Sequence, residues 1–378
     1  MSSVTVPLYK RIVEDIVERI DREEFAYGSQ LPSRAEMATR YGVSHITVQA
    51  ALKDLAHLGY VEGRRGAGVY VIHGAHPQPR PQIASSTIVI IGVRQPYNRA
   101  PHKDGWAKNV AAGAFEATLQ YGFNQTILHP DRLCQESMES LILNRPVGVV
   151  IPEGLPGPAV HYWASYLRNA GVPCVVYGDS PDLATFDRVT SDWRHGGRSL
   201  AEWLIAQGRR NIIQARPATV EGYWFGPLRE GYVSAMLEAG LQPNEVVRFE
   251  EAEAWDPTQD GFERRVRRAS SCLPEYLSCS VPVDAIMTAS DGHVPVFASA
   301  CRLFGKVPGD DVLVTGYDDY WANLPELEYE PAPPAASVDK HNFEIGERMV
   351  KLLLDRTEGK LAASAERIVV LPTVTTYK

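Results

Sequence analysis

The feature that most limits the possible fold is a series of short, apolar, β-branched runs that begins at Thr87. The first run is TIVIIGV, and further runs follow near residues 147–152, 173–178, 211–215, 283–290 and 311–317. A continuous apolar run of this length is typical of a strand buried on both faces of a parallel sheet. Stretches with a helical pattern separate the runs, and this alternation predicts βαβ units in a doubly wound α/β body.

The length of this body predicts two lobes rather than one. Residues 87–378 are more than a single small sheet needs, and the chain of 378 residues is long enough for two to three domains. Ligands of open α/β sheets bind outside the carboxyl ends of the strands. We therefore expect two doubly wound lobes with a ligand cleft between them.

The first 72 residues have a different pattern, which predicts a compact helical unit with a hairpin at its end. Ile12, Ile16 and Ile20 recur every four residues, as expected for the apolar stripe of an amphipathic helix between Pro7 and about Glu24. Acidic residues cluster between positions 14 and 24. The outer face of this helix is therefore negative and should point away from DNA.

Two further helices are predicted around a glycine corner. Ser33 followed by Glu36 has the spacing of a capping box at a helix start. Gly42 suits a left-handed C-terminal cap, and Ser44 suits the N-cap of a third helix. Two short helices joined by a glycine-containing turn form a helix-turn-helix. On the third helix, one apolar face is expected from Val48, Ala51, Leu52, Leu55 and Leu58.

The sequence GYVEGRRGAGVYVI predicts a wing after the third helix. It indicates a strand at 60–62, a glycine-rich turn at 63–68 and a second strand at 69–72. Arg64 and Arg65 are expected in the turn, where glycines permit close approach and guanidinium groups pair with phosphate oxygens. Residues 25–73 hold five basic and three acidic side chains, a local charge of 5 − 3 = +2.

The chain as a whole is acidic, with a formal net charge of −8. This excludes a protein that coats nucleic acid along its whole surface. It does not exclude a small DNA-binding head, because charges act locally within about 8–10 Å. The five cysteines are scattered, odd in number and without a CxxC pair, which predicts reduced thiols in the cytoplasm. We find no export signal at the N-terminus, and no apolar run reaches the ~20 residues of a membrane span.

A short segment with the composition of a linker separates the two parts. HGAHPQPRPQIASS, residues 73–86, contains three prolines and few large apolar side chains. The expected domains are therefore a winged helix-turn-helix at residues 1–72, a linker at 73–86 and the body at 87–378.

Both parts resemble known families. PLYKRIVEDIVERI, followed by LPSRAEMATRYGVSHITVQAALKDLAHLGYVEGRRGAGVYV, resembles the winged helix-turn-helix of the GntR family over about residues 6–72. The body resembles the effector domain of the LacI/GalR family. The segments that carry this likeness are SDWRHGGRSLAEWLIAQGRRNI, LREGYVSAMLEAGL, VDAIMTASDGHVPVFASACRLFGKVPGDDVLVTGYDD, and SVDKHNFEIGERMVKLLLDRTEG with RIVVLPTVTTYK. The combination is similar to the arabinose repressor class.

The resemblance implies a two-lobed, periplasmic-binding-protein-like body for effector binding and dimerisation. Its first lobe would hold about residues 87–188 and 342–360, and its second about 189–338 and 364–378. It also implies a ligand-responsive, DNA-binding transcription regulator, expected to be a repressor that works as a homodimer. A sugar or similar small polar effector between the lobes would switch its affinity for operator DNA. The alternative is a small-molecule sensor that does not bind DNA and whose N-terminal unit mediates protein contacts.

The expected DNA contacts lie on the first turns of the third helix, at Ser44, His45, Thr47 and Gln49. Ser and Thr contact bases or phosphates, and Gln pairs with adenine in the major groove. The alternative interpretation is that Ser44 and Thr47 only cap the helix and do not contact DNA. Arg34 is a further candidate, together with the two wing arginines. Relatives usually have arginine at the places of His45 and Gln49, so we expect an operator that differs from theirs.

In the body, the resemblance places Asp318 toward the cleft, where a carboxylate accepts hydrogen bonds from sugar hydroxyls. A helix N-cap is its alternative role. Ser290 stands where the family often has Asn, and its hydroxyl can still bond to a ligand. Arg229, one residue from the position of the family's ligand-binding arginine, is a further effector candidate. Aromatic rings cover the C–H faces of sugars. The candidates for this stacking role are Trp255, Trp106 and Tyr97, and a place in the core is an equal alternative for each.

Catalysis is not expected. Asp291 with His293, and Asp192 with His195, have the composition of acid–base or metal pairs. The sequence shows no nucleophile elbow, Walker loop, HExxH motif or Cys/His zinc spacing. We expect no enzyme activity, no cofactor and no metal.

Overall fold

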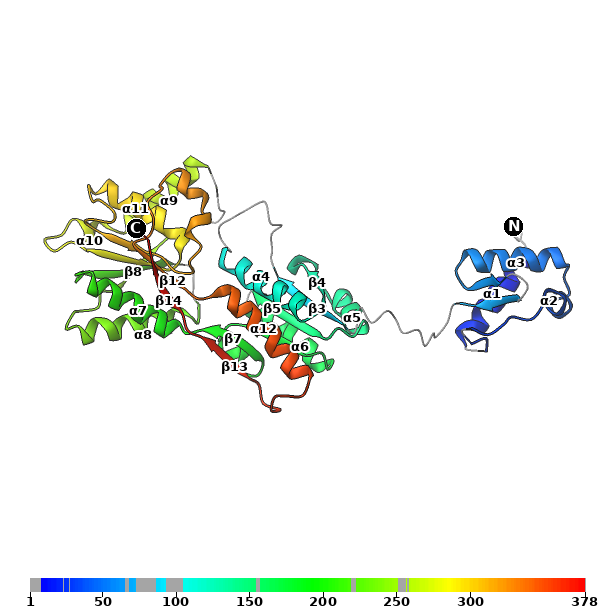
Figure 1. Cartoon of the computed structure of the whole chain (residues 1–378). Helices are drawn as coiled ribbons and strands as arrows, with labels where there is room; N and C mark the ends of the chain where they lie inside the picture. Colours follow the sequence, from blue (N-terminus) through cyan, green and yellow to red (C-terminus); the bar gives the residue numbers. More distant parts are fainter. Residues whose placement is uncertain are drawn as a thin grey trace. The chain divides into compact units, whose positions relative to one another are not determined.

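The computed structural model describes residues 8–22, 24–26, 28–64, 68–72, 86–92, 105–153, 157–218, 222–250, 256 and 258–377. The chain forms two compact units, Met1–Gln82 and Ile83–Lys378, and each is described by itself (Figure 1). Most of the expected linker, residues 73–85, lies outside the described residues. In the part of the chain that is described, no helix is long and apolar enough to cross a membrane.

The N-terminal unit, here called the head, consists of three helices and one hairpin. Helix α1 packs against α3, and strands β1 and β2 pair antiparallel. The isoleucine stripe at positions 12, 16 and 20 lies in the core of the head, as the periodicity predicts. The elements are α1 (Leu8–Asp21), α2 (Arg34–Tyr41), α3 (His45–His57), β1 (Val61–Arg64) and β2 (Gly68–Val71).

The corner between α2 and α3 confirms the predicted capping pattern. Ser33 and Glu36 form a complete capping box at the start of α2. Gly42 ends that helix with a left-handed φ of 63°, and the Ser44 hydroxyl accepts a hydrogen bond from the Thr47 backbone N–H at 3.3 Å. One expectation was wrong: Leu58 is the C-cap of α3 and is 57 % exposed, because the helix ends before this side chain can face the core.

The first lobe of the body contains a six-stranded parallel sheet in the order β13-β7-β6-β5-β3-β4. Alternate residues of β3 point to opposite faces: Ile88 and Ile90 pack with α4 and α12, whereas Val89 and Ile91 pack with α5 and α6. The strand is therefore buried at every position, and its central residues are all apolar. The strands are β3 (Thr87–Gly92), β4 (Asn124–Leu128), β5 (Gly148–Glu153), β6 (Cys174–Tyr177), β7 (Asp187–Ser191) and β13 (Arg367–Val370); the helices are α4 (Gly105–Gln120), α5 (Gln135–Leu143), α6 (Gly157–Asn169) and α12 (Asn342–Thr357).

The second lobe repeats this three-layer plan around a four-stranded parallel sheet in the order β11-β10-β8-β9. One apolar cluster lies between this sheet and helices α7 and α8, and another lies between it and α9 and α11. The strands are β8 (Ile212–Pro217), β9 (Val246–Phe249), β10 (Ala285–Thr288) and β11 (Leu313–Thr315); the helices are α7 (Trp193–Ala206), α8 (Phe225–Glu238), α9 (Gln259–Ser271), α10 (Pro274–Leu277) and α11 (Val294–Leu303).

Glycine pairs bring helices together in both lobes. A Cβ on Gly113 of α4 would lie 1.9 Å from the Phe343 carbonyl oxygen, and one on Gly346 of α12 would lie 2.0 Å from the Val110 carbonyl oxygen. Gly197 of α7 and Gly231 of α8 approach the partner helix's backbone in the same way. Each lobe therefore contains a helix pair packed backbone to backbone, where no larger residue fits.

The chain crosses between the lobes at three places: after β7, after β12 (Ala336–Asp339) and between β13 and β14 (Thr373–Thr376). Strands β12 and β14 pair antiparallel at the second lobe's end of these crossings. The expected boundaries at residues 188 and 364 need correction. Strand β7 continues to Ser191, and β13 pairs with it in the first sheet, so the last crossing comes only after Val370.

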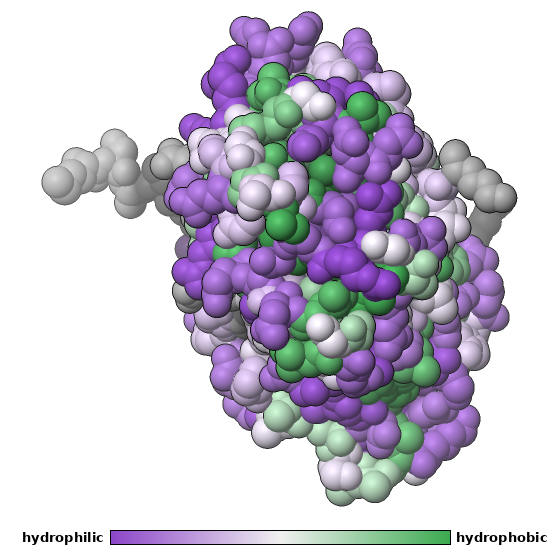
Figure 2. All heavy atoms as spheres, turned by 90° about the vertical axis from the view of Figure 1, so that its left-hand side faces the viewer, coloured by the Kyte–Doolittle hydropathy of each residue, from purple (hydrophilic) through white to green (hydrophobic). Residues whose placement is uncertain are grey.

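The surface of the second lobe is mixed in character. Figure 2 shows the side that lies at the left of Figure 1, where hydrophobic and hydrophilic residues are interspersed. Scattered apolar residues are normal on a folded surface.

Candidate nucleic-acid interface and effector site

Helix α3 has two distinct faces. Val48, Ala51 and Leu55 are fully buried against the rest of the head. On the opposite side, His45 and Gln49 are exposed, Ser44 is exposed just before the helix, and Thr47 is half-buried. Ser44 and Thr47 cap the helix, with their hydroxyl oxygens 3.0 Å apart. Both proposed roles therefore fit these two residues, because a cap at an exposed first turn leaves the hydroxyls accessible. Arg34 is exposed at the first position of α2.

Ile46 is a feature of this surface that the sequence interpretation missed. It is 80 % exposed on the first turn of α3, between His45 and Thr47. A signal was present in the sequence, because Ile46 is out of phase with Val48, Ala51, Leu52 and Leu55. An exposed isoleucine beside polar groups can make the apolar contact that recognises a thymine methyl group.

The wing differs from the expectation at Arg64. This residue is the last of β1, opposite Gly68, and not part of the turn. The strand extends beyond its apolar residues because Gly63 and Arg64 still pair with Val69 and Gly68 of β2. The guanidinium carbon of Arg64 lies 4.5 Å from the centroid of the Tyr70 ring. Arg64 also lies 3.8 Å from the Glu62 carboxylate. Arg65 lies outside the described residues.

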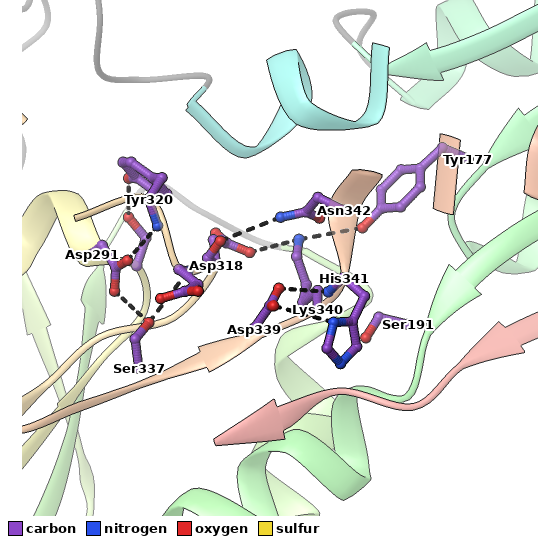
Figure 3. A network of polar contacts seen from close by, with 12 residues as sticks. Tyr177, Ser191, Asp291, Asp318, Tyr320, Ser337, Asp339, Lys340, His341 and Asn342 are labelled. Atoms are coloured by element: carbon purple, nitrogen blue, oxygen red, sulfur yellow. Dashed lines mark hydrogen bonds and ion pairs between the residues drawn. The ribbon is translucent and has the colours of Figure 1, made fainter. Parts of the chain in front are cut away.

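In the body, side chains from both lobes meet in a group that we call the interlobe cluster. It consists of Tyr177, Asp318, Lys340 and Asn342, which Figure 3 labels, and of Trp193, whose ring lies beside the Lys340 ammonium. Asp318 follows β11 of the second lobe and is 6 % exposed. Its backbone N–H donates to the Val338 carbonyl at 2.8 Å, and its own carbonyl accepts from the Asn342 amide at 3.3 Å. These bonds hold Asp318 against the β12–α12 crossing.

Lys340 is at the centre of the interlobe cluster. Its ammonium lies 2.6 Å from an Asp318 carboxylate oxygen, donates to the Tyr177 hydroxyl at 3.4 Å, and lies 4.6 Å from the centroid of the Trp193 ring. The Trp193 ring stacks in turn on Tyr317. Burial raises the pKa of the Asp318 carboxyl, and the Lys340 ammonium opposes this rise. Sequence reasoning found Asp318 but neither Lys340 nor Trp193.

The backbone around the cluster is strained at three positions. Asp318, Asp319 and His341 have φ values of 90°, 53° and 57°, in the left-handed region that side chains disfavour. Such residues cost about 1–3 kcal/mol each and persist where the surroundings enforce them, often at functional sites. Two of them follow β11 and the third follows Lys340 in the crossing, so the strain concentrates at this cluster.

A second carboxylate, Asp291, fixes the loop that carries Asp318. Its oxygens accept hydrogen bonds from the backbone N–H groups of Tyr320 at 2.7 Å and Trp321 at 3.0 Å, and from the Ser337 hydroxyl at 2.6 Å. Burial raises the pKa of the Asp291 carboxyl to about 8, although the hydrogen bonds that it accepts favour its ionised form and lower the pKa. Ser290 joins this network, with its hydroxyl 2.8 Å from the Tyr320 hydroxyl. The predicted sites Ser290 and Asp318 therefore belong to one connected region.

The other predicted effector residues do not belong to the interlobe cluster as it is described. The structure places Arg229 apart from the cluster: its guanidinium donates to the Gln214 side chain at 2.9 Å and to the Asn244 carbonyl at 2.7 Å, within the second lobe. Trp106 is the second residue of α4, and its neighbour Gly105 packs against the Tyr320 ring. Tyr97 and Trp255 lie outside the described residues. No group of three metal-binding side chains is found in the described ranges.

Comparison with known proteins finds family matches in both the head and the body of the chain. The family described as "Bacterial regulatory proteins, gntR family" matches residues 8–71, and the "Periplasmic binding protein-like domain" matches residues 201–376. Among curated relatives, the arabinose metabolism transcriptional repressor of Geobacillus stearothermophilus is 25 % identical over 329 residues, covering 85 % of this chain and 84 % of the relative. The transcriptional regulator CelR of Thermobifida fusca is 31 % identical over 198 residues, covering 51 % and 53 %.

Solved structures extend the likeness over nearly the whole fold. A CelR–cellobiose complex aligns with a TM-score of 0.58 and 21 % identity, covering 92 % of this chain and 99 % of that one. A LacI-family regulatory protein from Chloroflexus aggregans aligns with a TM-score of 0.60 and 23 % identity, covering 77 % and 96 %. The expected architecture, a winged helix-turn-helix followed by a two-lobed body, is confirmed.

Proposed function

Because the chain carries a gntR-type helix-turn-helix domain ahead of a periplasmic-binding-protein-like domain, we propose that it is a one-component transcription regulator. The observation that carries the proposal is α3: one face forms the core of the head, and the other presents an exposed polar first turn. Helices of this kind enter the major groove by their N-terminal residues. The full-length relatives are repressors and regulators of transcription, and we propose repression for this chain.

On the DNA side, the proposed base-reading residues are His45, Ile46 and Gln49. Gln49 pairs with adenine and Ile46 contacts a thymine methyl group. Ser44, Thr47, Arg34 and the wing arginines Arg64 and Arg65 are proposed to contact the phosphate backbone, which positions the head without reading the sequence.

On the effector side, we propose a sugar that donates a hydroxyl hydrogen bond to Asp318. Cellobiose occupies a structural neighbour, and arabinose metabolism is controlled by a relative. Ser290 and the ring of Trp193, which lies beside the Lys340 ammonium, are proposed to complete the pocket, and Tyr97, Trp106 and Trp255 remain proposed stacking residues. We do not include Arg229, because its donors already bind Gln214 and Asn244.

The proposed regulator is a cytoplasmic homodimer. Palindromic operators are read by two heads related by twofold symmetry. A sugar that binds one arrangement of the lobes better than the other would shift their equilibrium and thereby alter operator affinity.

The DNA-binding part is tested by selecting operator duplexes from a random library with the full-length chain. Fluorescence anisotropy then gives the affinity as a function of salt. The proposal predicts sequence-dependent binding with a steep negative salt slope, and a loss of about 1–3 kcal/mol in Gln49→Ala when adenine is the contacted base. A chain that shows no salt-dependent DNA binding would instead be a sensor whose head serves protein contacts.

A further inference from the structure

Lys340 is an unusual residue for the interior of a protein. Its side chain is 1 % exposed, although a free ammonium prefers water. A buried charge is retained only with a partner of opposite charge and further polar contacts. Here the partner is Asp318 at 2.6 Å, and the further contact is the Tyr177 hydroxyl at 3.4 Å.

The contacts of this ammonium belong to both lobes. Tyr177 is the last residue of β6 in the first lobe, and Asp318 follows β11 in the second. Lys340 itself lies in the crossing from β12 to α12, and Trp193, whose ring faces the ammonium, lies directly after the crossing from β7. Figure 3 shows the lysine between Asp318 and Tyr177. One charge thus connects two lobes and two of the three crossings.

The carboxylate of Asp318 depends on this charge. Lys340 and His293 lower the pKa of Asp318, and the Asp339 carboxylate raises it. It acts in turn on the neighbouring acids, raising the pKa of Asp291, Tyr317 and Tyr320. Burial raises the pKa of Asp318, and Lys340 contributes the largest opposing effect. Without Lys340, the protonated form of Asp318 would be favoured.

We propose that Lys340 is a positioning residue of the effector site: its ammonium keeps Asp318 an ionised hydrogen-bond acceptor and ties that acceptor to the first lobe through Tyr177. The inference rests on the proposed function, in which Asp318 accepts a hydrogen bond from a sugar hydroxyl. A protonated carboxyl is a weaker hydrogen-bond acceptor than a carboxylate, and it also donates a hydrogen bond. The site therefore binds polyhydroxylated ligands most tightly when Asp318 is ionised.

The sign of the pH effect follows from this geometry. Asp318 loses its charge as the pH falls through its pKa. Replacing Lys340 with a neutral side chain raises that pKa further, so the loss begins at a higher pH than in the wild type. Each pH unit below the pKa reduces the ionised fraction about tenfold, and sugar affinity should fall in proportion.

The first measurement needs no ligand. The full-length chain is labelled with ¹³Cγ-aspartate, and the Asp318 resonance is assigned through Asp318→Asn. We expect the inflection of this resonance to move to higher pH in Lys340→Met and Lys340→Gln, and to stay near the wild-type position in Lys340→Arg. Arg302→Met is the matched control, because it removes another ion pair of the second lobe, with the buried Glu330 at 2.9 Å, away from the cluster.

The second measurement is binding of cellobiose and of arabinose by calorimetry at pH 6 and pH 8. For the sugar that binds the wild type, we expect Lys340→Met to lose more affinity than the wild type when the pH falls from 8 to 6, because its Asp318 carboxyl is protonated at a higher pH. Lys340→Arg should restore the wild-type profile. The double variant Lys340→Met with Asp318→Asn should lose the part of the pH dependence that comes from Asp318, and what remains is the contribution of other groups such as Asp291, whose pKa burial raises to about 8.

Two results would overturn the role of Lys340. One is an Asp318 inflection that does not move in either neutral variant. The other is an affinity loss of equal size at both pH values, which would make the pair purely structural. If the wild type binds neither sugar at any pH while the inflection moves as expected, neither cellobiose nor arabinose is the effector, whereas the effect of Lys340 on the charge of Asp318 is upheld.

Discussion

Ile46 illustrates how a single side chain can be judged by its surroundings. Isoleucine is normally buried, yet this one is 80 % exposed beside the polar residues of α3. The core of the head is already filled by Val48, Ala51 and Leu55 from the same helix. The exposed position therefore adds nothing to folding and is available for a contact with a base.

Replacement of thymine by deoxyuridine in the operator tests this contact, because the exchange removes one methyl group. We expect the wild type to lose about fourfold in affinity at one thymine position, corresponding to roughly 0.8 kcal/mol for one buried carbon. Ile46→Ala should bind both duplexes equally. Equal sensitivity of the two proteins to uridine at every position would contradict the assignment.

Asp318 is the second residue whose role can be isolated. Asparagine keeps its shape and tolerates the positive φ of 90°, so Asp318→Asn removes the charge with little change of shape and leaves the buried Lys340 ammonium without its carboxylate partner. A hydrogen bond to a charged group contributes about 1.5–3 kcal/mol, and we expect at least about tenfold weaker sugar binding by calorimetry. Asp319→Asn is the control, since Asp319 pairs with Tyr377 and also has a positive φ. Similar losses in both variants would refute a specific role for Asp318.

At the scale of elements, the glycine corner of the helix-turn-helix depends on backbone conformation alone. A Cβ on Gly42 would meet no atom within 4 Å, so Gly42→Ala costs only the strain of its φ of 63°, about 1–2 kcal/mol. Gly63 is equally open but has no positive φ. Hydrogen exchange of α2 and α3 peptides in the full chain should accelerate about fivefold or more in Gly42→Ala and little in Gly63→Ala. Comparable exchange rates in the two variants would contradict the claim that the left-handed conformation of Gly42 stabilises the corner.

The wing contributes charge to an acidic chain. Arg64→Ala should reduce the magnitude of the slope of log K against log salt by about 0.9, the value for one phosphate contact. Arg22→Ala is the control, because Arg22 is exposed directly after α1, within the acidic stretch of residues 14–24, and pairs with Glu18. An unchanged slope in Arg64→Ala would remove the wing from the interface.

Some elements were predictable from sequence and others were not, for physical reasons. Strands β3, β5, β6, β8, β10 and β11 were expected because burial on both faces makes them largely apolar. Strand β4 was missed because it lies at the edge of its sheet and is largely exposed. Lys340 was missed because its meaning depends on Asp318 and on Tyr177, which is 163 residues away in the chain. Sequence periodicity does not report such pairings.

At the scale of the whole molecule, the function depends on coupling between the body and the head. Three crossings join the lobes, and the Lys340 ammonium connects both lobes at one of them. A ligand that changes the lobe arrangement acts on the same segments that hold Asp318. Coupling free energies of this kind typically amount to about 1–3 kcal/mol.

The most direct test is operator affinity at fixed salt, measured with and without a saturating sugar. The sugar is first found by thermal shift among mono- and disaccharides, because a bound ligand raises the unfolding temperature. We expect the sugar to change operator affinity by about 5- to 150-fold, and the operator to change sugar affinity by the same factor. A sugar that demonstrably binds the body but leaves operator affinity unchanged would contradict the account.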